Sequence, residues 1–331
     1  MSVEATAPGK MILFGEHSVV YKGPAIVIAI DKRARVIAFK RGDNRIYIDA
    51  DDLGFSGYFE NELYYPTHGK AWRGRNLSAL NITARKVMEH IGIEGGLTLV
   101  VRSMIPIAVG LGSSAAVCVA TAAAVGELFN GNLTKEEIAT LSFEGERIIH
   151  GTPSGVDNNV ATYGGIMRYE RGKSFERLKL DSTLPFIIGN TRFKRSTRDQ
   201  VENVKMLKDR NPEFVDPIIE VMGNISRVGL DALLNRDLPK LGDLMNINHG
   251  LLSALGVSTG DLDRLVHAAR RTGALGAKLT GAGGGGCIIA LAEEQNLSNV
   301  EKAIQLMRGE SLRVNITDEG VQTRRLEPGN S

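Results

Sequence analysis

Clustered glycine is the feature of this 331-residue chain that most constrains its fold. Glycine occurs 38 times, well above the average usage of about 7%. Four stretches, 8–26, 105–116, 144–165 and 278–287, hold 15 of these glycines. A cluster of glycines allows positive φ angles and lets a ligand or another backbone approach closely. The sequence therefore predicts a framework of helices and strands that carries four glycine-rich loops.

Composition excludes several classes of protein. Lys and Arg number 40 against 38 Asp and Glu, so the chain lacks the positive field of a typical nucleic-acid binder. The N-terminal residues have neither the basic nor the apolar segment of a signal peptide. The uncharged segment 103–126 is interrupted by Pro106, Gly110 and Gly112, which leaves less than the ~20 residues of a membrane span. We expect a cytoplasmic protein without nucleic-acid or membrane partners.

Apolar periodicity predicts a mixture of helices and strands. The first half is predicted to have strands at 25–30, 34–39, 97–102 and 160–169, and helices at 80–91, from 113 and from 134. The second half is predicted to be mainly helical over 196–271, with strands at 274–279, 286–292, 311–317 and 321–326 and a helix near 298–307. This pattern favours an α+β fold of two domains, 1–182 and 183–331, with a shared cleft.

The stretch 105–116 is a candidate anion-binding loop. A helix is predicted to begin near Ser113, and the free N–H groups and dipole of a helix start favour a phosphate. Ser113 and Ser114 supply two hydroxyls, of which one could cap the helix and the other could reach a metal. A cap and tight turn without a ligand remains an alternative. The dinucleotide fingerprint fails here because no acid-ending strand follows, and a Walker A sequence is absent.

Charged residues in the other glycine stretches are candidate catalytic groups. Lys10 follows a glycine near an N-terminal strand, Glu146 lies on a predicted helix, and Asp157 lies in a predicted loop. One carboxylate can bind a cation while the other orients or deprotonates a hydroxyl, as phosphoryl transfer requires. Taken alone, Lys10 could be a surface lysine and Asp157 a turn residue. The six histidines show no metal-ligand spacing, so zinc is not expected.

The glycine run 283–286 needs more than a hairpin to explain it. Successive glycines cost conformational entropy on folding. Close approach of a ligand or of another backbone is therefore favoured over a simple hairpin turn.

Together and in order, the four stretches resemble the GHMP kinase superfamily over nearly the whole chain. The segments 15–21 (Gly-Glu-His-Ser-Val-Val-Tyr) and 144–158 are similar to the mevalonate kinases within it, in their archaeal or bacterial form. The segment 190–198 resembles that family's motif beside the transferred phosphate. One departure is Val-Tyr-Lys-Gly-Pro-Ala at 20–25, where the family commonly reads Val-Tyr-Gly-x-Pro-Ala, so the local turn at Lys22 and Gly23 is expected to differ.

The resemblance implies both a fold and an activity. The fold is an N-terminal domain like domain 2 of ribosomal protein S5, followed by an α+β domain, with the active site in the cleft. The activity is phosphorylation of the C5 hydroxyl of (R)-mevalonate by ATP and Mg²⁺, in isoprenoid biosynthesis. Alternatives are another small-molecule kinase of the superfamily, a related decarboxylase, or a sensor that binds ATP and metabolite without turnover. The partner is a small molecule, and a homodimer is compatible with the sequence.

The resemblance also implies residue roles. It assigns the ATP phosphates to Gly110, Leu111, Gly112, Ser113, Ser114 and Ala115, with Gly283 and Gly284 closing against the nucleotide region, and Mg²⁺ to Ser114 and Glu146. Asp157 takes the proton of the hydroxyl or orients it, and Lys10 stabilises charge beside it. The mevalonate and γ-phosphate side is lined by Lys10, Glu16, His17, Asp157, Thr197 and Arg198.

Overall fold

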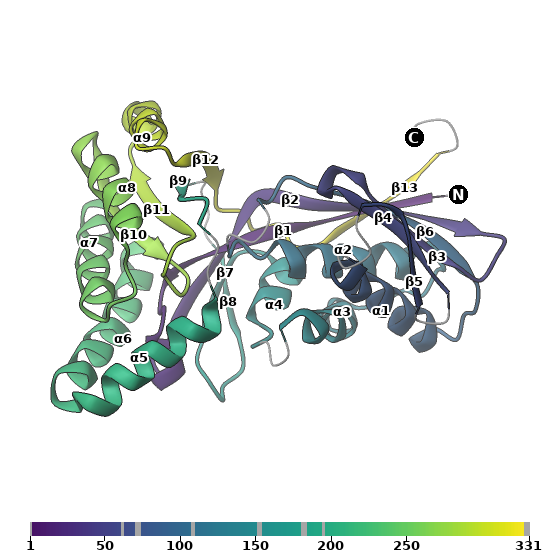
Figure 1. The fold of residues 1–331 in the computed structure, drawn as a ribbon, viewed down its shortest axis with the longest axis horizontal. Coiled ribbons are helices and arrows are strands. Elements are labelled where there is room, and N and C mark those ends of the chain that lie inside the picture. The colour runs from purple at the N-terminus through teal and green to yellow at the C-terminus, as the bar shows by residue number, and fades with distance from the viewer. Residues whose placement is uncertain are drawn as a thin grey trace.

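The computed structural model describes residues 2–60, 63–69, 74–106, 110–150, 154–179, 184–193 and 196–327. Within these ranges the strands form two sheets, which lie towards opposite ends of an elongated molecule (Figure 1). Helices pack against both sheets. The predicted α+β class is therefore confirmed.

The larger sheet has nine strands in the described ranges. Its order is β13-β1-β2-β6-β3-β4-β5, with β7 paired to β2 and to β8. The strands are β1 (Ser2–Phe14), β2 (Ala25–Arg41), β3 (Ile46–Ala50), β4 (Phe55–Glu60), β5 (Leu63–His68), β6 (Gly96–Ser103), β7 (Ile166–Tyr169), β8 (Glu176–Leu178) and β13 (Gln322–Leu326). Pairing is antiparallel except between β3 and β6. Strand β1 is buried along nearly its whole length, so it can hold a polar side chain at a defined depth.

Four helices cover one face of this sheet (Figure 1). They are α1 (Gly74–His90), α2 (Ser113–Leu128), α3 (Lys135–His150) and α4 (Val156–Tyr163). Helix α2 lies against β1 and β2 and also contacts α1 and α3, so its small alanine side chains are buried almost all round. Helix α3 begins at the predicted capping box, in which the Thr134 amide donates to Glu137 Oε2 (2.7 Å) and the Glu137 amide donates to Thr134 Oγ1 (3.2 Å).

The smaller sheet is antiparallel and has the order β10-β11-β9-β12 among the described residues. Its strands are β9 (Pro185–Asn190), β10 (Ala274–Thr280), β11 (Cys287–Ala292) and β12 (Glu310–Asn315). The helices of this half are α5 (Thr197–Arg210), α6 (Pro212–Leu234), α7 (Leu238–Ala254), α8 (Gly260–Arg271) and α9 (Glu294–Leu306). The predicted helical region and the predicted late strands are confirmed. They could be predicted because these segments are long enough for a helical period to be told from a strand period.

The prediction of a strand over 160–169 is wrong in its first half. Val160 lies in α4, and the strand β7 begins only at Ile166. Gly155 (φ 77°) and Gly164 (φ 69°) bound the helix in conformations that favour glycine, and eight residues are too few to show a helical period. As a consequence Asp157, predicted to lie in a loop, lies in the first turn of α4.

Two further features differ from the expected layout. The predicted strands 25–30 and 34–39 are one strand, β2, which continues through three charged residues. The predicted domain boundary at 180–183 lies outside the described residues, and it stays a prediction. Strand β13 pairs with β1 from Ser2↔Leu326 to Thr6↔Gln322, so the end of the chain returns to the larger sheet. Among the described residues, no helix is long and apolar enough to cross a membrane.

Candidate active site

Lys10 and Asp157 form an ion pair between β1 and α4. The Lys10 Nζ lies 3.1 Å from Asp157 Oδ1, and the side chains are 9% and 37% exposed. The lysine is therefore anchored in the sheet, whereas the carboxylate can be reached from solvent. This pairing brings together two residues that are 147 positions apart in the sequence.

The glycine loop before α2 packs directly on Lys10. The Lys10 amide donates to Leu111 O (2.9 Å), and a Cβ at Gly112 would lie 2.8 Å from Lys10 Cγ. Gly112 has φ 73°, so a side chain here would meet both backbone strain and a steric clash. Glycine is therefore needed at position 112 to bring the loop against the lysine.

The N-terminus of α2 fits the predicted anion site in its described part, which begins at Gly110. Gly112 is its N-cap, without a capping side chain, and its first turn has no acidic residue. Neither of the two hydroxyls that could cap the helix does so, and that of Ser113 lies 3.4 Å from the hydroxyl oxygen of Ser103. Backbone N–H groups and the positive end of the helix dipole are thus left to attract a phosphate.

Ser114 and Glu146 also lie together. The Ser114 hydroxyl donates to Glu146 Oε1 over 2.5 Å, and Glu146, on α3, is 2% exposed. Mg²⁺ prefers oxygen ligands, keeps several waters, and takes only one or two protein ligands beside substrate phosphates. A hydroxyl and a carboxylate beside the predicted anion-binding start of α2 fit that requirement.

The glycine-rich segment 281–286 connects β10 to the neighbouring β11, so it is a hairpin after all. It also meets other backbone closely: the Gly284 amide donates to Val257 O (2.7 Å), and the Gly286 amide donates to Phe193 O (3.1 Å). A Cβ at Gly283 would lie only 2.2 Å from Val257 O. The predicted close approach is therefore made by backbone within the chain.

The described residues 190–193 lie beside this hairpin. Thr191 donates to Gly286 O through both its amide and its hydroxyl, each over 2.9 Å. Thr197 and Arg198 are exposed in the first turn of α5, which Ser196 caps. A Cβ at Gly284 would lie 2.5 Å from Nε2 of Gln200, so the beginning of α5 lies near the glycine hairpin. The contacts of Thr197 and Arg198 with a ligand stay predictions.

Glu16 is deeply buried and makes an ion pair with Lys278 of β10. Both side chains are 0% exposed, and Asn248 Nδ2 donates to the second Glu16 oxygen over 3.4 Å. Burial raises the pKa of Glu16 and lowers that of Lys278, while their opposite charges act against both shifts. The contact of Glu16 with substrate stays a prediction, and the carboxylate faces Lys278.

His17 joins the end of the β1 region to the glycine hairpin. Its Nε2 lies 2.9 Å from Ala282 O, and its backbone adopts φ 61°. The Thr280 hydroxyl donates to Ile12 O over 2.8 Å and makes a second connection. Strand β1 thus links two groups of candidates, one around Lys10 and Asp157 and one around the hairpin 281–286.

Lys278 is a residue whose role sequence reasoning missed. It lies in the middle of an apolar strand and is fully buried. A buried lysine needs a counter-charge, so a lysine in an apolar strand is itself a signal. That signal does not say which carboxylate is the partner.

Two family models and several curated relatives match this chain. Residues 78–165 match the family model described as GHMP kinases N terminal domain, and residues 230–307 match GHMP kinases C terminal. The chain is 44% identical over 332 residues to mevalonate kinase of Thermococcus sibiricus, covering 97% of this chain and 98% of that protein. It is 43% identical to mevalonate kinase of Pyrococcus furiosus, with the same coverage of each. The chain belongs to the mevalonate kinase family of the GHMP kinases.

Solved structures of the mevalonate kinase family have the same fold. The Methanococcus jannaschii enzyme superposes with a TM-score of 0.80 at 30% identity, covering 96% of this chain and 98% of that one. The L. major enzyme in complex with R-mevalonate gives a TM-score of 0.81 at 29% identity, with 95% and 96% coverage. These superpositions cover both the part of the chain that holds the larger sheet and the part that holds the smaller sheet.

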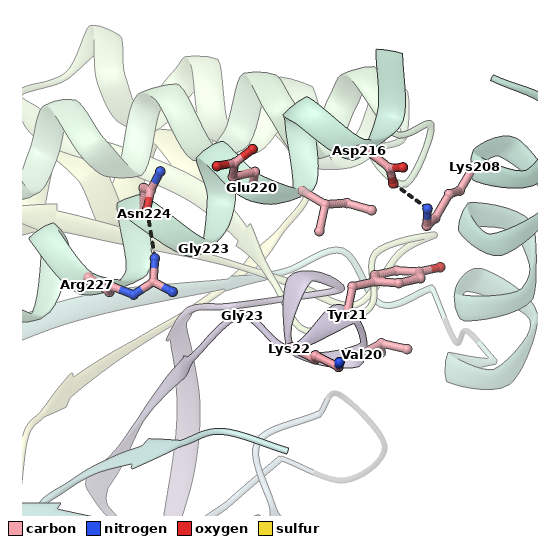
Figure 2. A pocket seen from close by; sticks show the side chains of 11 residues that line it. Val20, Tyr21, Lys22, Gly23, Lys208, Asp216, Glu220, Gly223, Asn224 and Arg227 are labelled. Carbon is pink, nitrogen blue, oxygen red and sulfur yellow. Dashed lines mark hydrogen bonds and ion pairs between the residues drawn. The ribbon is translucent and has the colours of Figure 1, made fainter. Parts of the chain in front are cut away.

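The departure of this chain from the family pattern lies beside a cavity of about 580 Å³ (Figure 2). The cavity lies between η1 (Ser18–Tyr21) with the residues after it and helices α5 and α6. Lys22 lines it and adopts φ 74°, while Gly23 comes so close to Ser18 that a Cβ would lie 3.0 Å from Ser18 Oγ. The exchange therefore leaves a lysine in the conformation that favours glycine.

Proposed function

We propose that the chain transfers the γ-phosphoryl group of ATP to the C5 hydroxyl of (R)-mevalonate, giving 5-phosphomevalonate and ADP. The observation that carries this proposal is the partly open Lys10–Asp157 pair packed against the loop before α2. Relatives named mevalonate kinase and the neighbour solved with R-mevalonate support the choice of acceptor.

On the acceptor side, Asp157 orients the C5 hydroxyl and receives its proton. As the hydroxyl oxygen bonds to the γ-phosphorus, the bond to the β-phosphate oxygen breaks and ADP leaves with that electron pair. Lys10, held 3.1 Å from the carboxylate, stabilises negative charge near the reacting oxygen. His17, Thr197 and Arg198 complete the mevalonate and γ-phosphate side.

On the donor side, the residues from Gly110 to Ala115 hold the ATP phosphates through backbone N–H groups and the dipole of α2. Gly283 and Gly284 close the nucleotide region from the other half of the molecule. Ser114 and Glu146 would hold Mg²⁺, which neutralises phosphate charge when it is bound. The near-zero net charge of the chain is compatible with this site, because binding uses local groups.

A parallel acceptor assay tests the proposal. ADP release is measured with Mg-ATP and mevalonate, phosphomevalonate, galactose or homoserine, and ³¹P NMR identifies the product as a C5 phosphomonoester. We expect the highest kcat/KM with mevalonate. A preference for another acceptor rejects the assignment, and absence of turnover with ATP bound would indicate a sensor.

A further inference from the structure

Strand β10 is an edge strand of the smaller sheet among the described residues, and helix α7 covers that edge. Side chains of α7 satisfy its outward backbone groups. Asn246 donates to Leu275 O and accepts from the Ala277 amide, each over 3.1 Å. His249, one helical turn further on, accepts from the Leu279 amide at Nδ1 over 3.3 Å. The helix therefore takes the place of a neighbouring strand and sets the position of β10.

The contacts of His249 determine which ring nitrogen carries its proton. Because Nδ1 accepts from the Leu279 amide, the proton of the neutral ring must be on Nε2. Nε2 lies 3.2 Å from Asp263 Oδ1 on α8, which also accepts from Ser258 over 2.5 Å. The carboxylate of Asp263 thus selects the tautomer that the strand requires.

Burial, together with the cations around His249, keeps the ring neutral near pH 7. Burial, followed by the charge of Arg270, lowers the pKa of His249 to about 4, and Lys278 acts in the same direction. The carboxylate of Asp263 raises the pKa of His249, but by less than burial and the two cations lower it. A charged ring would place a proton on Nδ1, where it would oppose the Leu279 N–H.

The same contacts determine where the glycine hairpin begins and what it packs on. Leu279 follows Lys278, the partner of Glu16, and precedes the hairpin by two residues. The turn between α7 and α8 supplies Val257 O, which accepts from the Gly284 amide over 2.7 Å. The strand that enters the hairpin and the turn that supports it are therefore both connected to His249 and Asp263.

We propose that His249 and Asp263 are positioning residues for phosphoryl transfer. His249, protonated at Nε2 and oriented by Asp263, sets the position of β10 and thereby of Lys278 and the hairpin 281–286. The effect on catalysis rests on the function proposed above, whereas the effect on the hairpin does not.

Two measurements test the structural part on the full-length protein. ¹⁵N NMR at pH 7 should show Nε2 of His249 protonated and Nδ1 unprotonated. Hydrogen exchange should show faster exchange of the Leu279, Gly284 and Gly286 amides in His249→Leu than in wild type. His267→Leu, which changes an exposed histidine on the neighbouring helix α8, is the matched control and should exchange like wild type.

Kinetics tests the functional part. We expect His249→Leu to lower kcat by about 10- to 100-fold, because small misplacements away from the reacting atoms have effects of that size. His249→Gln should stay within about threefold of wild type, because its amide can accept from Leu279 and donate to Asp263. Asp263→Ala should lower kcat less than His249→Leu, because the Leu279 amide still donates to Nδ1 of the ring.

Specific outcomes would overturn the proposal. A proton on Nδ1 in the wild type at pH 7 contradicts it, and so does folded His249→Leu protein with the kcat, KM and hairpin exchange of the His267→Leu control. If wild type does not phosphorylate mevalonate, the proposed function fails, but the exchange and NMR results still decide whether His249 positions the hairpin.

Discussion

Two Lys–carboxylate pairs lie close along the same stretch of chain and differ in their surroundings. Lys10 lies in β1 and pairs with Asp157, which is 37% exposed. Glu16 lies just beyond the same strand and pairs with Lys278, and neither side chain is exposed. The residue types are alike, and only the depth of burial differs.

The difference teaches that burial decides whether an ion pair is available for chemistry. In the Lys10–Asp157 pair the lysine is nearly buried but the carboxylate is partly exposed, so water competes for the Asp157 charge and lowers the net contribution of the pair to stability. Asp157 can therefore exchange its partner for a substrate hydroxyl without a large loss. A sealed pair is different, because removing one charge leaves the other without solvent or partner. The open pair suits catalysis, and the sealed pair suits holding two segments together.

The largest expected effect comes from the open pair. Asp157→Asn should lower kcat by about 10²- to 10⁴-fold, the range for losing a general base, with little change in ATP binding. Steady-state kinetics and nucleotide titration measure the two effects, with Asp231→Asn on α6 as an exposed control. Near-normal turnover would remove Asp157 from the mechanism. The Lys10–Asp157 pair would then differ from the Glu16–Lys278 pair in burial but not in function.

The second effect concerns stability and should come from the sealed pair. Lys278→Met should lower the free energy of unfolding by about 3–5 kcal/mol, because it leaves the Glu16 carboxylate buried without its partner. The double variant Glu16→Gln, Lys278→Met should recover much of that loss.

Lys10→Met is the matched control for this measurement. Its loss should be no more than about 1 kcal/mol, because Asp157 keeps contact with water. Denaturant unfolding measures all three variants. Equal losses in Lys278→Met and Lys10→Met would contradict the idea that burial separates the two pairs.

The third effect is a pH dependence of the free energy of unfolding, which comes from the buried His249. The folded pKa of His249 is about 4 against 6.5 for an ordinary histidine, so the unfolded chain binds the proton more readily. This contribution to stability is complete above pH 6.5 and is lost as the pH falls towards 4, by roughly 2–3 kcal/mol. His249→Gln should show a flatter dependence in unfolding experiments between pH 4 and 7. The same slope in both proteins would exclude His249 as its source.

The smallest expected effect concerns the turn at Lys22 and Gly23, which follows Glu16 in the sequence. It tests whether this turn acts on the site independently of the buried Glu16–Lys278 pair. Lys22 has φ 74°, so Lys22→Gly should raise the free energy of unfolding by up to about 1 kcal/mol and leave kcat unchanged. Gly23→Ala is the counterpart and should destabilise, because its Cβ would press on Ser18. A fall in kcat for Lys22→Gly would show that the turn acts on the site.

Many residues of the candidate site could be proposed from the sequence because they lie in local sequence patterns. Loop 110–114, Glu146 on its helix and the candidates Lys10 and Asp157 were found this way, and the structure brings Lys10 to Asp157 and Ser114 to Glu146. The short helix α4 was missed because glycines, rather than a long apolar period, set its ends.

The sequence by itself determined the fold class, the family and the places where backbone must approach closely, because these depend on residue type and spacing along the chain. The tertiary structure alone decided that Lys278 pairs with Glu16 and that His249 supports β10. Both depend on burial and on contacts between residues far apart in sequence. The glycine loops indicated where a ligand or another backbone approaches closely, whereas the packing of β10 against α7 and the end of β1 decided that Lys278 and Glu16 are buried together.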